Sequence, residues 1–434
     1  MDRLAPTFAA ENNRIGAPVK IAVVGTGIAG MVAAYKLHRE HDITVFEADE
    51  RIGGHTNTVD VDIDGVKTPI DTGFIVFNEK TYPDFCALMR ELGVAWQASE
   101  MSFSVRCDTT GLEYNGTSID GLFAQRTNAL RPSFLRMVRD ILRFYKEAPA
   151  LLATNDDRLT LGEFLDRGRY SKQFVEKHIL PMGAAIWSAR LENMRTFPMR
   201  FLVQFFHNHG FMQVDGRPQW LTIRGGSRTY AKQLTAPFQS RIRLRTAITS
   251  VRRVPSGVAV RTAAGDEAQF DRVVLATHAD QSLRMLVDAS AKEREILGAF
   301  GFQRNDAALH TDTSIMPKKR RAWASWNYHV TGSPSDLPTV TYWMNRLQSL
   351  TTQRDYLVTL NRNDAIDPAT VVKRFVYHHP IYSTASVAAQ RRHAEIDGVA
   401  GVHFCGAYWG YGFHEDGVKS ALAVLSHIPA EVLV

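Results

Sequence analysis

Residues 19–56 read VKIAVVGTGIAGMVAAYKLHREHDITVFEADERIGGHT, and the order of features in this stretch decides the fold. The apolar residues 19–24 predict a short buried strand, and residues 28–39 have the composition of a helix. Between them lie three glycines spaced G-x-G-x-x-G, which are Gly25, Gly27 and Gly30. The first permits a tight turn, the second lets the backbone approach a pyrophosphate, and the third lets the helix pack closely on the strand. The stretch therefore predicts a phosphate-binding turn.

A dinucleotide has the groups that this turn and the following residues can hold. The pyrophosphate would lie at the helix start, at Ile28 and Ala29, where free N–H groups and the positive end of the helix dipole favour it. The second strand, residues 43–46, ends at Glu47, whose carboxylate can accept a hydrogen bond from a ribose hydroxyl. Strand, glycines, helix, strand and acid in this order predict dinucleotide binding, and both NAD and FAD meet that requirement.

The residues after this acid distinguish the two cofactors. Arg51, Gly53, Gly54 and Thr58 follow it in the pattern E-x-x-x-R-x-G-G-x-x-x-T. With this pattern the sequence resembles the FAD-dependent amine oxidase superfamily, which includes monoamine and polyamine oxidases, protoporphyrinogen oxidase and carotenoid desaturases. The resemblance implies FAD as the cofactor, with the motif extending the phosphate loop over its pyrophosphate. His55 stands where the family often has arginine, so a phosphate contact there and covalent attachment of the flavin both stay open.

Later segments resemble the same superfamily. Residues 71–78, DTGFIVFN, match the strand and turn that pass beside the flavin ring, and residues 270–280, FDRVVLATHAD, match the strand before the crossing to the substrate domain. Residues 222–234 carry paired glycines before an amphipathic helix, and residues 402–424 resemble the second flavin motif, with a helix that begins near residues 415–417. Residues 242–265 alternate apolar and polar side chains around a Pro-Ser-Gly turn, which predicts a hairpin.

The resemblance implies FAD contacts at positions spread along the chain. These positions are Gly25, Gly27, Ile28, Ala29, Gly30, Glu47, Ala48, Arg51, Gly53, Gly54, His55, Thr56, Gly73, Phe74, Ile248, Ala276, Thr277, Gly406, His414, Glu415 and Gly417. The backbone of Ile248 would contact the adenine. Amides at the start of the last helix would face the pyrimidine edge of the flavin, where negative charge grows on reduction.

The length of 434 residues exceeds the size at which a single core keeps growing, so two domains are expected. We expect an α/β fold that combines a discontinuous Rossmann-type FAD-binding domain with an α+β substrate (cap) domain. The FAD-binding domain would comprise residues 18–80, 214–285 and 390–434. The substrate domain would comprise residues 81–213 and 286–389.

The substrate end departs from the amine oxidases that the sequence resembles. Those enzymes carry a lysine that helps the reduced flavin react with oxygen, whereas Asn305 or Asp306 falls nearest that position here. The paired tyrosines that cage an amine are incomplete, because Phe413 occupies one expected place beside Tyr411 and Trp409. A cation loses part of its binding without the full cage, so the sequence favours an apolar substrate.

Several side chains are candidates for catalysis. We expect His414, Asn305 and Tyr328 to have this role, and His414 has the strongest claim because its backbone lies in the flavin motif. Other candidates near the flavin are His278, His310, Asp312, Trp326, Tyr342 and Glu415. Isolated aromatic residues and a carboxylate at a helix start are also ordinary structural features, so that reading stays open for each.

Two histidine clusters and three cysteines are the residues that could form a metal or redox site. The histidines at residues 207–209 and 377–380 lack a carboxylate or cysteine at ligand spacing, so we interpret them as structural or surface residues and expect no metal. Three scattered cysteines exclude a disulfide framework and favour a reducing, cytoplasmic location. Residues 1–18 are typical of a loose tail rather than a secretory signal.

The sequence predicts an FAD-dependent oxidoreductase that removes hydride from a hydrophobic substrate, a lipid acyl chain, as a desaturase or dehydrogenase. Residues 309–329 and 412–421 resemble bacterial flavoproteins that are themselves similar to the N-terminal flavin region of plant cyclopropane fatty acid synthases. One alternative is an amine oxidase that makes peroxide. Another is a non-redox flavoprotein, either an isomerase or a partner of a lipid methyltransferase.

The formal charge of +6 favours an acidic partner or an anionic surface. Clustered base-reading or stacking signatures are missing, so nucleic acid is not an expected partner. Residues 125–149 place apolar side chains at helical spacing among arginines, which fits a helix on an anionic membrane or a helix packed on its own core. Residues 316–321, MPKKRR, form a second cationic segment. No segment is long and apolar enough to span a membrane, and the oligomeric state stays open.

Overall fold

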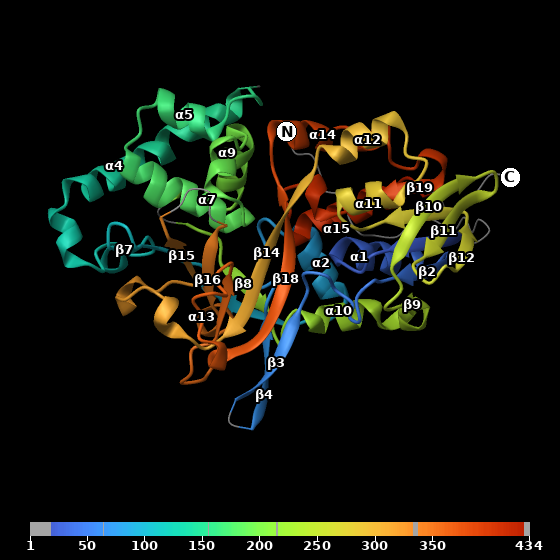
Figure 1. Ribbon diagram of the computed structural model, residues 1–434, viewed down its shortest axis with the longest axis horizontal. Helices are drawn as coiled ribbons and strands as arrows, with labels where there is room; N and C mark the ends of the chain where they lie inside the picture. The colour runs from blue at the N-terminus through green and yellow to red at the C-terminus, as the bar shows by residue number, and fades with distance from the viewer. Residues whose placement is uncertain (1–18, 64, 155, 214–215, 333–336, 429–434) are drawn as a thin grey trace.

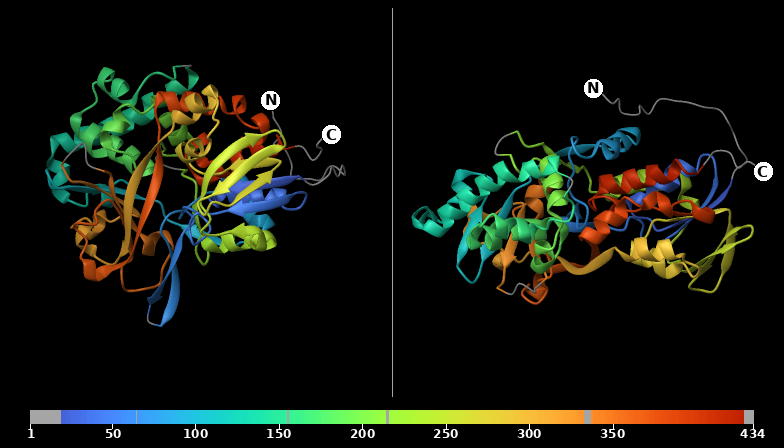
Figure 2. Two further views of the ribbon diagram at one scale, coloured as in Figure 1. Left: turned by 45° about the vertical axis from the view of Figure 1, so that its right-hand side comes forward. Right: turned by 90° about the horizontal axis from the view of Figure 1, so that it is seen from above.

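The structure is a computed structural model that describes residues 19–63, 65–154, 156–213, 216–332 and 337–428. Two parts, each built around one large sheet, lie side by side (Figures 1 and 2). One part holds a parallel sheet between layers, and the other holds a mixed sheet covered by helices. The predicted α/β class is confirmed. The segment predicted as a loose tail, residues 1–18, lies outside the described residues.

The parallel sheet is built from short apolar strands. Its strands are β1 (Lys20–Val24), β2 (Asp42–Phe46), β9 (Ile242–Arg243), β13 (Arg272–Leu275) and β19 (Val402–Phe404). They follow the order β19-β13-β1-β2-β9, and all neighbours are parallel. Ile21 and Val23 face one layer while Ala22 and Val24 face the other, so β1 is buried on both sides, as parallel strands usually are.

Helices and a second sheet cover the two faces. Helices α1 (Ile28–Leu37), α2 (Pro83–Glu91), α10 (Arg228–Thr235) and α15 (His414–Leu425) share one hydrophobic core. The opposite core contains α11 (Ala279–Met285), α12 (Ala291–Gly298) and the antiparallel strands β10 (Ile248–Val254), β11 (Gly257–Thr262) and β12 (Glu267–Phe270). The predicted hairpin is confirmed at β10 and β11. Its first two residues instead form β9, because they pair with β2.

The mixed sheet has seven strands in the order β18-β14-β17-β16-β15-β6-β7. These strands are β6 (Phe103–Cys107), β7 (Leu112–Asn115), β14 (Gly301–His310), β15 (Trp326–Val330), β16 (Thr339–Trp343), β17 (Leu357–Leu360) and β18 (Val371–Ile381). Neighbours are antiparallel except β15 and β6, which are parallel. Strands from two distant parts of the chain, residues 103–115 and 301–381, therefore form one sheet.

A helical layer packs on the mixed sheet. Its helices are α3 (Ile119–Leu122), α4 (Pro132–Glu147), α5 (Leu161–Arg167), α6 (Lys172–Phe174), α7 (Leu180–Trp187), α8 (Leu191–Arg195) and α9 (Met199–Asn208). Fully buried phenylalanines at 134, 174 and 206 fill the core between these helices and the strands. Two short helices, α13 (Met344–Leu347) and α14 (Thr384–Gln390), complete the set.

The predicted domain boundaries stay a prediction, and one observation bears on them. The prediction placed α12 and α14 in the substrate domain. Ile296, Leu297 and Ala389 of these helices, however, pack in the core that β13 and β19 share. A boundary drawn by packing would therefore lie beyond residue 298 in this region.

Residues 125–149 were expected to form an amphipathic helix. Most of this segment forms α4, Pro132–Glu147, and Arg126–Leu130 before it form a 3₁₀ turn. Phe134, Met137 and Phe144 are fully buried on its inner face. Leu135 and Leu142 are 45% and 54% exposed on its outer face. The helix is therefore packed on its own core and still presents leucines to solvent.

None of the described helices combines the length and the apolar character that crossing a bilayer requires. Cys86, Cys107 and Cys405 are buried, and none of them forms a disulfide bond with another described cysteine.

Two small sheets connect the parts. They pair β3 (Thr58–Ile63) with β4 (Val66–Asp71), and β5 (Trp96–Ser99) with β8 (Trp220–Ile223). At the end of β4, Asp71 is fully buried, and its carboxylate accepts hydrogen bonds from the backbone N–H and the hydroxyl of Ser227, both at 2.8 Å. It also accepts from the Thr58 hydroxyl at 2.6 Å, while burial raises the pKa of this carboxyl to about 6. Asp71 thus ties the β3–β4 hairpin to the start of α10.

Replacing this carboxylate should destabilise the protein. We predict that Asp71→Ala lowers the free energy of unfolding by about 3 kcal/mol, because the Ser227 N–H would stay buried without an acceptor. Chemical denaturation with and without flavin measures this change. The control Asp62→Ala removes an exposed carboxylate from the same hairpin, which among the described residues accepts a hydrogen bond from the Gly65 N–H, and should cost less than about 0.5 kcal/mol. Equal losses in the two variants would contradict the assignment.

Candidate FAD site

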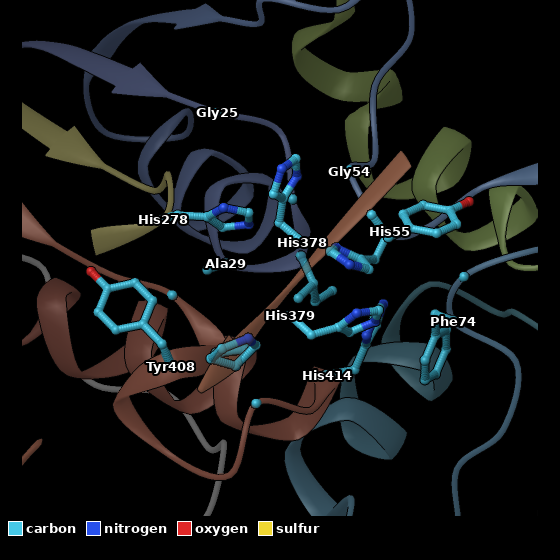
Figure 3. A pocket seen from close by; sticks show the side chains of 18 of the residues that line it. Gly25, Ala29, Gly54, His55, Phe74, His278, His378, His379, Tyr408 and His414 are labelled. Carbon is cyan, nitrogen blue, oxygen red and sulfur yellow. The ribbon is translucent and has the colours of Figure 1, made fainter. Parts of the chain in front are cut away.

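A cavity of about 790 Å³ lies at the junction of the two parts (Figure 3). One wall comes from the glycine turn after β1, the loop after β2, the start of β10 and the end of β13. The other wall comes from α7, α9, β16 and the end of β18. The loop between β19 and α15 closes it. The segments that the sequence singled out separately therefore surround one space.

The glycine turn has room where a phosphate would lie. Gly25 has φ +101°, a conformation that favours glycine, and a Cβ on Gly30 would lie 2.0 Å from the Gly25 carbonyl oxygen. By contrast, a Cβ on Gly27 would meet nothing within 4 Å. No side chain caps the start of α1, and its first turn contains no acid. The helix start therefore offers free N–H groups to an anion in the cavity.

The loop that follows is held by two side chains. Arg51 donates to the carbonyl of Gly54 at 2.8 Å and to that of Thr56 at 3.2 Å. Glu47 lines the cavity and accepts hydrogen bonds from the backbone N–H groups of Thr26 and Asp49, each at 2.9 Å. Arg51 thus holds the loop that contains Gly53 and Gly54 in place. Glu47 links the residues that follow β2 to the glycine turn after β1.

His55 lies at the centre of the cavity wall (Figure 3). Its ring stacks on Tyr377 with centroids 5.0 Å apart and lies 5.2 Å from the ring of His379. Burial, followed by the nearby histidines, holds the pKa of His55 well below its usual value, so the ring is neutral. Its Nε2 atom is buried and has no hydrogen-bond partner among the described residues. An unpaired polar atom in a cavity wall fits a bound cofactor that supplies the missing partner.

His414, the first residue of α15, also lines the cavity. Its ring stacks on Phe74 with centroids 3.5 Å apart, and Nε2 lies 2.9 Å from the Tyr230 hydroxyl and 3.2 Å from the Thr56 hydroxyl. Burial lowers the pKa of His414 to about 3, so this imidazole is neutral near pH 7. Gly73 passes so close to this region that a Cβ would lie 2.1 Å from the His55 carbonyl oxygen. The site is therefore shaped by neutral rings and backbone.

Most predicted FAD positions line the cavity. These are Gly25, Gly27, Ile28, Ala29, Glu47, Ala48, Arg51, Gly53, Gly54, His55, Gly73, Phe74, Ile248, Ala276, Thr277, Gly406 and His414. Gly30, Thr56, Glu415 and Gly417 do not. Gly30 allows the close helix contact, and Thr56 supports His414. The set fits FAD, which supplies a hydride acceptor when bound, although the individual contacts stay a prediction.

The remaining predicted positions have structural roles near the site. Glu415 accepts from the N–H groups of Asp84 at 3.2 Å and Phe85 at 2.9 Å at the start of α2, and pairs with Lys419 at 3.2 Å, so its carboxylate points away from the cavity. A Cβ on Gly417 would lie 2.6 Å from the side chain of Ile28, so this glycine lets α15 pack on α1.

Two predicted catalytic residues lie outside the cavity. Asn305 is fully buried in β14, where its side-chain amide donates to Nδ1 of His379 at 3.0 Å, so it orients a cavity residue rather than lining the space. Tyr328 is buried in the core between β15 and the helical layer. Among the secondary candidates, His310 binds the Thr359 hydroxyl at 2.8 Å, and Asp312 caps a short 3₁₀ turn.

The structure also brings in residues that sequence reasoning missed. His378 and His379 line the cavity, as does His209, although these clusters were interpreted as structural or surface residues. The pairing of β18 with β14 sets the position of His378 and His379, whereas His209 follows the end of α9, and no local pattern signals either long-range placement. No group of metal-ligating side chains gathers in the described part of the chain. His278, Trp326 and Tyr342 line the cavity as the sequence suggested.

Charge is unevenly distributed around the cavity. Its charged lining residues are Glu47, Asp49, Arg51 and Arg284, all near the dinucleotide turn or α11. The other end is lined by Met101, Ile186, Trp187, Phe205, Phe211, Trp220 and Tyr342. Burial lowers the pKa of His209, His278 and His379 to about 4 each, so these histidines add no positive charge near pH 7. The far end is thus an uncharged, aromatic space, and we refer to it as the apolar arm.

The open position at Gly27 gives a direct test of the dinucleotide site. We predict that Gly27→Val folds normally, since a Cβ at this position would meet no described atom within 4 Å, but loses FAD because the side chain fills the phosphate position. Flavin absorbance per protein after purification, with circular dichroism for the fold, measures both effects. Gly30→Val is the contrasting variant and should fail to fold, because its Cβ would collide with the Gly25 backbone. Full flavin content in Gly27→Val would contradict the site.

Comparisons with known proteins agree with this geometry. A family model described as flavin containing amine oxidoreductase matches residues 28–424. A Mycobacterium tuberculosis protein named as a flavin-containing monoamine oxidase, AofH, is 27% identical over 266 residues, which cover 58% of this chain and 56% of that protein. The chain thus matches about half the length of that relative.

Solved structures share the fold. Cyclohexylamine oxidase from Brevibacterium oxydans has a TM-score of 0.68 at 17% identity, and a fatty acid isomerase from P. acnes has a TM-score of 0.68 at 15% identity. Each comparison covers 95% of this chain and 99% of the other. Because the family model spans nearly all of the described residues, the chain belongs to the family of flavin-containing amine oxidoreductases.

Proposed function

We propose that this oxidoreductase removes hydride from a hydrophobic substrate, a lipid acyl chain, as a desaturase or dehydrogenase. The apolar arm is the observation that carries the proposal. Burying an acyl chain among aromatic and aliphatic side chains is favourable by about 0.8 kcal/mol per CH₂ group, and the arm offers such a surface along one end of the cavity.

The same arm is a poor place for an amine. No carboxylate of the described residues lines it, and no lysine lines the cavity at all. An ammonium group entering the arm would lose its hydration without an ion pair in return, which is strongly unfavourable. The neutral histidines and Phe413 do not compensate, since they supply neither a negative charge nor a complete aromatic cage.

The chain's own residues contribute mainly by orientation. The apolar arm would hold a substrate C–H in line with the cofactor, and such positioning is a large part of catalysis in hydride transfer. His379, oriented by Asn305, and His55 lie beside each other in the cavity wall. We propose that these neutral rings exclude water and fix the cofactor, and that His414 supports the wall through Phe74 and Tyr230.

The names of similar proteins support two alternative functions. Amine oxidation is what the names of AofH and of cyclohexylamine oxidase state for those proteins. Isomerisation is what the name of the P. acnes fatty acid isomerase states, and it would use the same apolar arm without net oxidation. A flavoprotein that partners a lipid methyltransferase is a third role, in which bound lipid would be neither oxidised nor isomerised by this chain alone.

The visible spectrum under anaerobic conditions separates these roles. We predict that a lipid extract bleaches the oxidised flavin band, whereas a panel of primary and secondary amines leaves it unchanged. Bleaching by an amine alone would reverse the assignment to amine oxidation. A rearranged double bond in recovered lipid, with the flavin still oxidised at the end, would assign isomerisation instead.

A charge placed in the apolar arm should damage substrate use and spare the cofactor. We predict that Phe211→Asp lowers kcat/KM for the apolar substrate roughly 30-fold, since its side chain lines the arm. Stopped-flow flavin reduction measures the change. Phe211→Leu keeps an apolar surface and should lose less than about threefold. Flavin content should stay unchanged in both, and equal activities of the two variants would count against the role of the arm.

A further inference from the structure

The helical layer presents large apolar side chains to solvent on α4 and on two short segments that precede it in sequence. Among the described residues, the exposed large apolar side chains include Ile119 at 79%, Leu130 at 85%, Leu135 at 45% and Leu142 at 54%. These four lie on α3, on the short 3₁₀ turn Arg126–Leu130 and on α4. Figure 1 shows α4 at the outer edge of this part, on the side away from the parallel sheet.

Leucines and cations share the outward face of α4. Residues 135, 139, 142 and 146 follow one another at spacings of three or four, so they lie along one side of the helix. Leu135, Arg139, Leu142 and Lys146 are all exposed, and Arg131 continues the row at the helix start. We call the exposed residues 119, 130, 131, 135, 136, 139, 142 and 146 the α4 surface.

The positive charge of the α4 surface is not neutralised by ion pairs with the described residues. Arg143 pairs with Glu147 at 2.9 Å, and Arg126 pairs with Asp120. No ion pair joins Arg131, Arg136, Arg139 or Lys146 to a carboxylate of the described residues. More cations lie close by, since the backbone N–H groups of the exposed Lys318 and Lys319 donate to Glu113 on β7, next to α3. The region therefore carries an excess of positive charge.

A recess beside α4 extends the cationic region. It has a volume of about 650 Å³, and its lining includes Ser133, Arg136, Lys172 and Lys177 together with Glu176, whose carboxylate pairs with Lys172 at 3.7 Å. Lys177 is only 8% exposed and has no ion pair with a carboxylate of the described residues. The two lysines, the arginine and the Ser133 hydroxyl that line this recess, at a helix start that no side chain caps, are suited to a phosphate group.

We propose that the α4 surface docks on an anionic lipid bilayer. The leucines enter the boundary between headgroups and acyl chains, while the row of cations and the recess contact lipid phosphates. Leucines alternating with unpaired cations on one helix face suit this partner. Nucleic acid would instead need stacking aromatic residues or base-reading groups, which the α4 surface lacks. The inference does not depend on the proposed substrate, because none of these residues lines the FAD cavity.

Sedimentation with lipid vesicles tests the proposal on the flavin-loaded protein. Vesicles of phosphatidylcholine are compared with vesicles that mix phosphatidylcholine and phosphatidylglycerol. The protein should partition at least about tenfold more strongly onto the mixed vesicles. The variant Arg131→Gln, Arg139→Gln, Lys146→Gln should weaken that binding roughly 100-fold, since each cation near an anionic surface contributes about a factor of five.

A matched control removes three exposed cations elsewhere, as Lys232→Gln, Arg294→Gln and Arg374→Gln, and should change binding by less than about threefold. Leu135→Ser with Leu142→Ser should weaken binding about tenfold, whereas Leu244→Ser with Val287→Ser, exposed outside the α4 surface, should not. Flavin absorbance and circular dichroism confirm that each variant is folded.

Three outcomes would overturn the inference. The first is equal partition of the wild-type protein onto neutral and mixed vesicles. The second is binding of the α4 triple variant as tight as that of the wild type. The third is a dimer in solution that the α4 variants dissociate, which would assign the surface to a second copy of this chain.

Discussion

The close approach of α1 to the turn after β1 is the constraint on which the site depends. Gly30 has no side chain, so the first turn of α1 rests directly against the Gly25 backbone, where even a methyl group would lie 2.0 Å from the carbonyl oxygen. A second close contact, between Gly417 and Ile28, packs α15 against the same helix. The loop before α15, with Gly406 and His414, is thereby brought to the cavity.

Local patterns predicted the part of the site that depends on local geometry. Turn glycines, a strand end and an acid at a fixed spacing are defined by a few neighbouring residues, and these positions surround one cavity. The direction of the Glu415 side chain could not be predicted in this way, because the backbone at a helix start does not determine where a flexible carboxylate points. Its side chain reaches the free N–H groups of α2, a partner far away in the sequence.

The substrate side could not be predicted in the same detail. His378 and His379 line the cavity because the register in which β18 pairs with β14 brings this end of β18 to it, and neighbouring residues do not specify that register. Asn305 sits in that same sheet, where alternation directs it toward His379 rather than into the space. Tyr328 illustrates the general difficulty, since aromatic residues in strands are most often core.

The order of the strands has a consequence for how this molecule folds. In the parallel sheet, β1 from the beginning of the described chain is separated from β19, near its end, only by β13. Helices α1 and α15 pack together across a similar separation in sequence. Contacts between such distant residues require closing a very long loop, which is slow and entropically unfavourable until many contacts form together. During synthesis, the cofactor cavity therefore cannot close before β19 and α15 have left the ribosome.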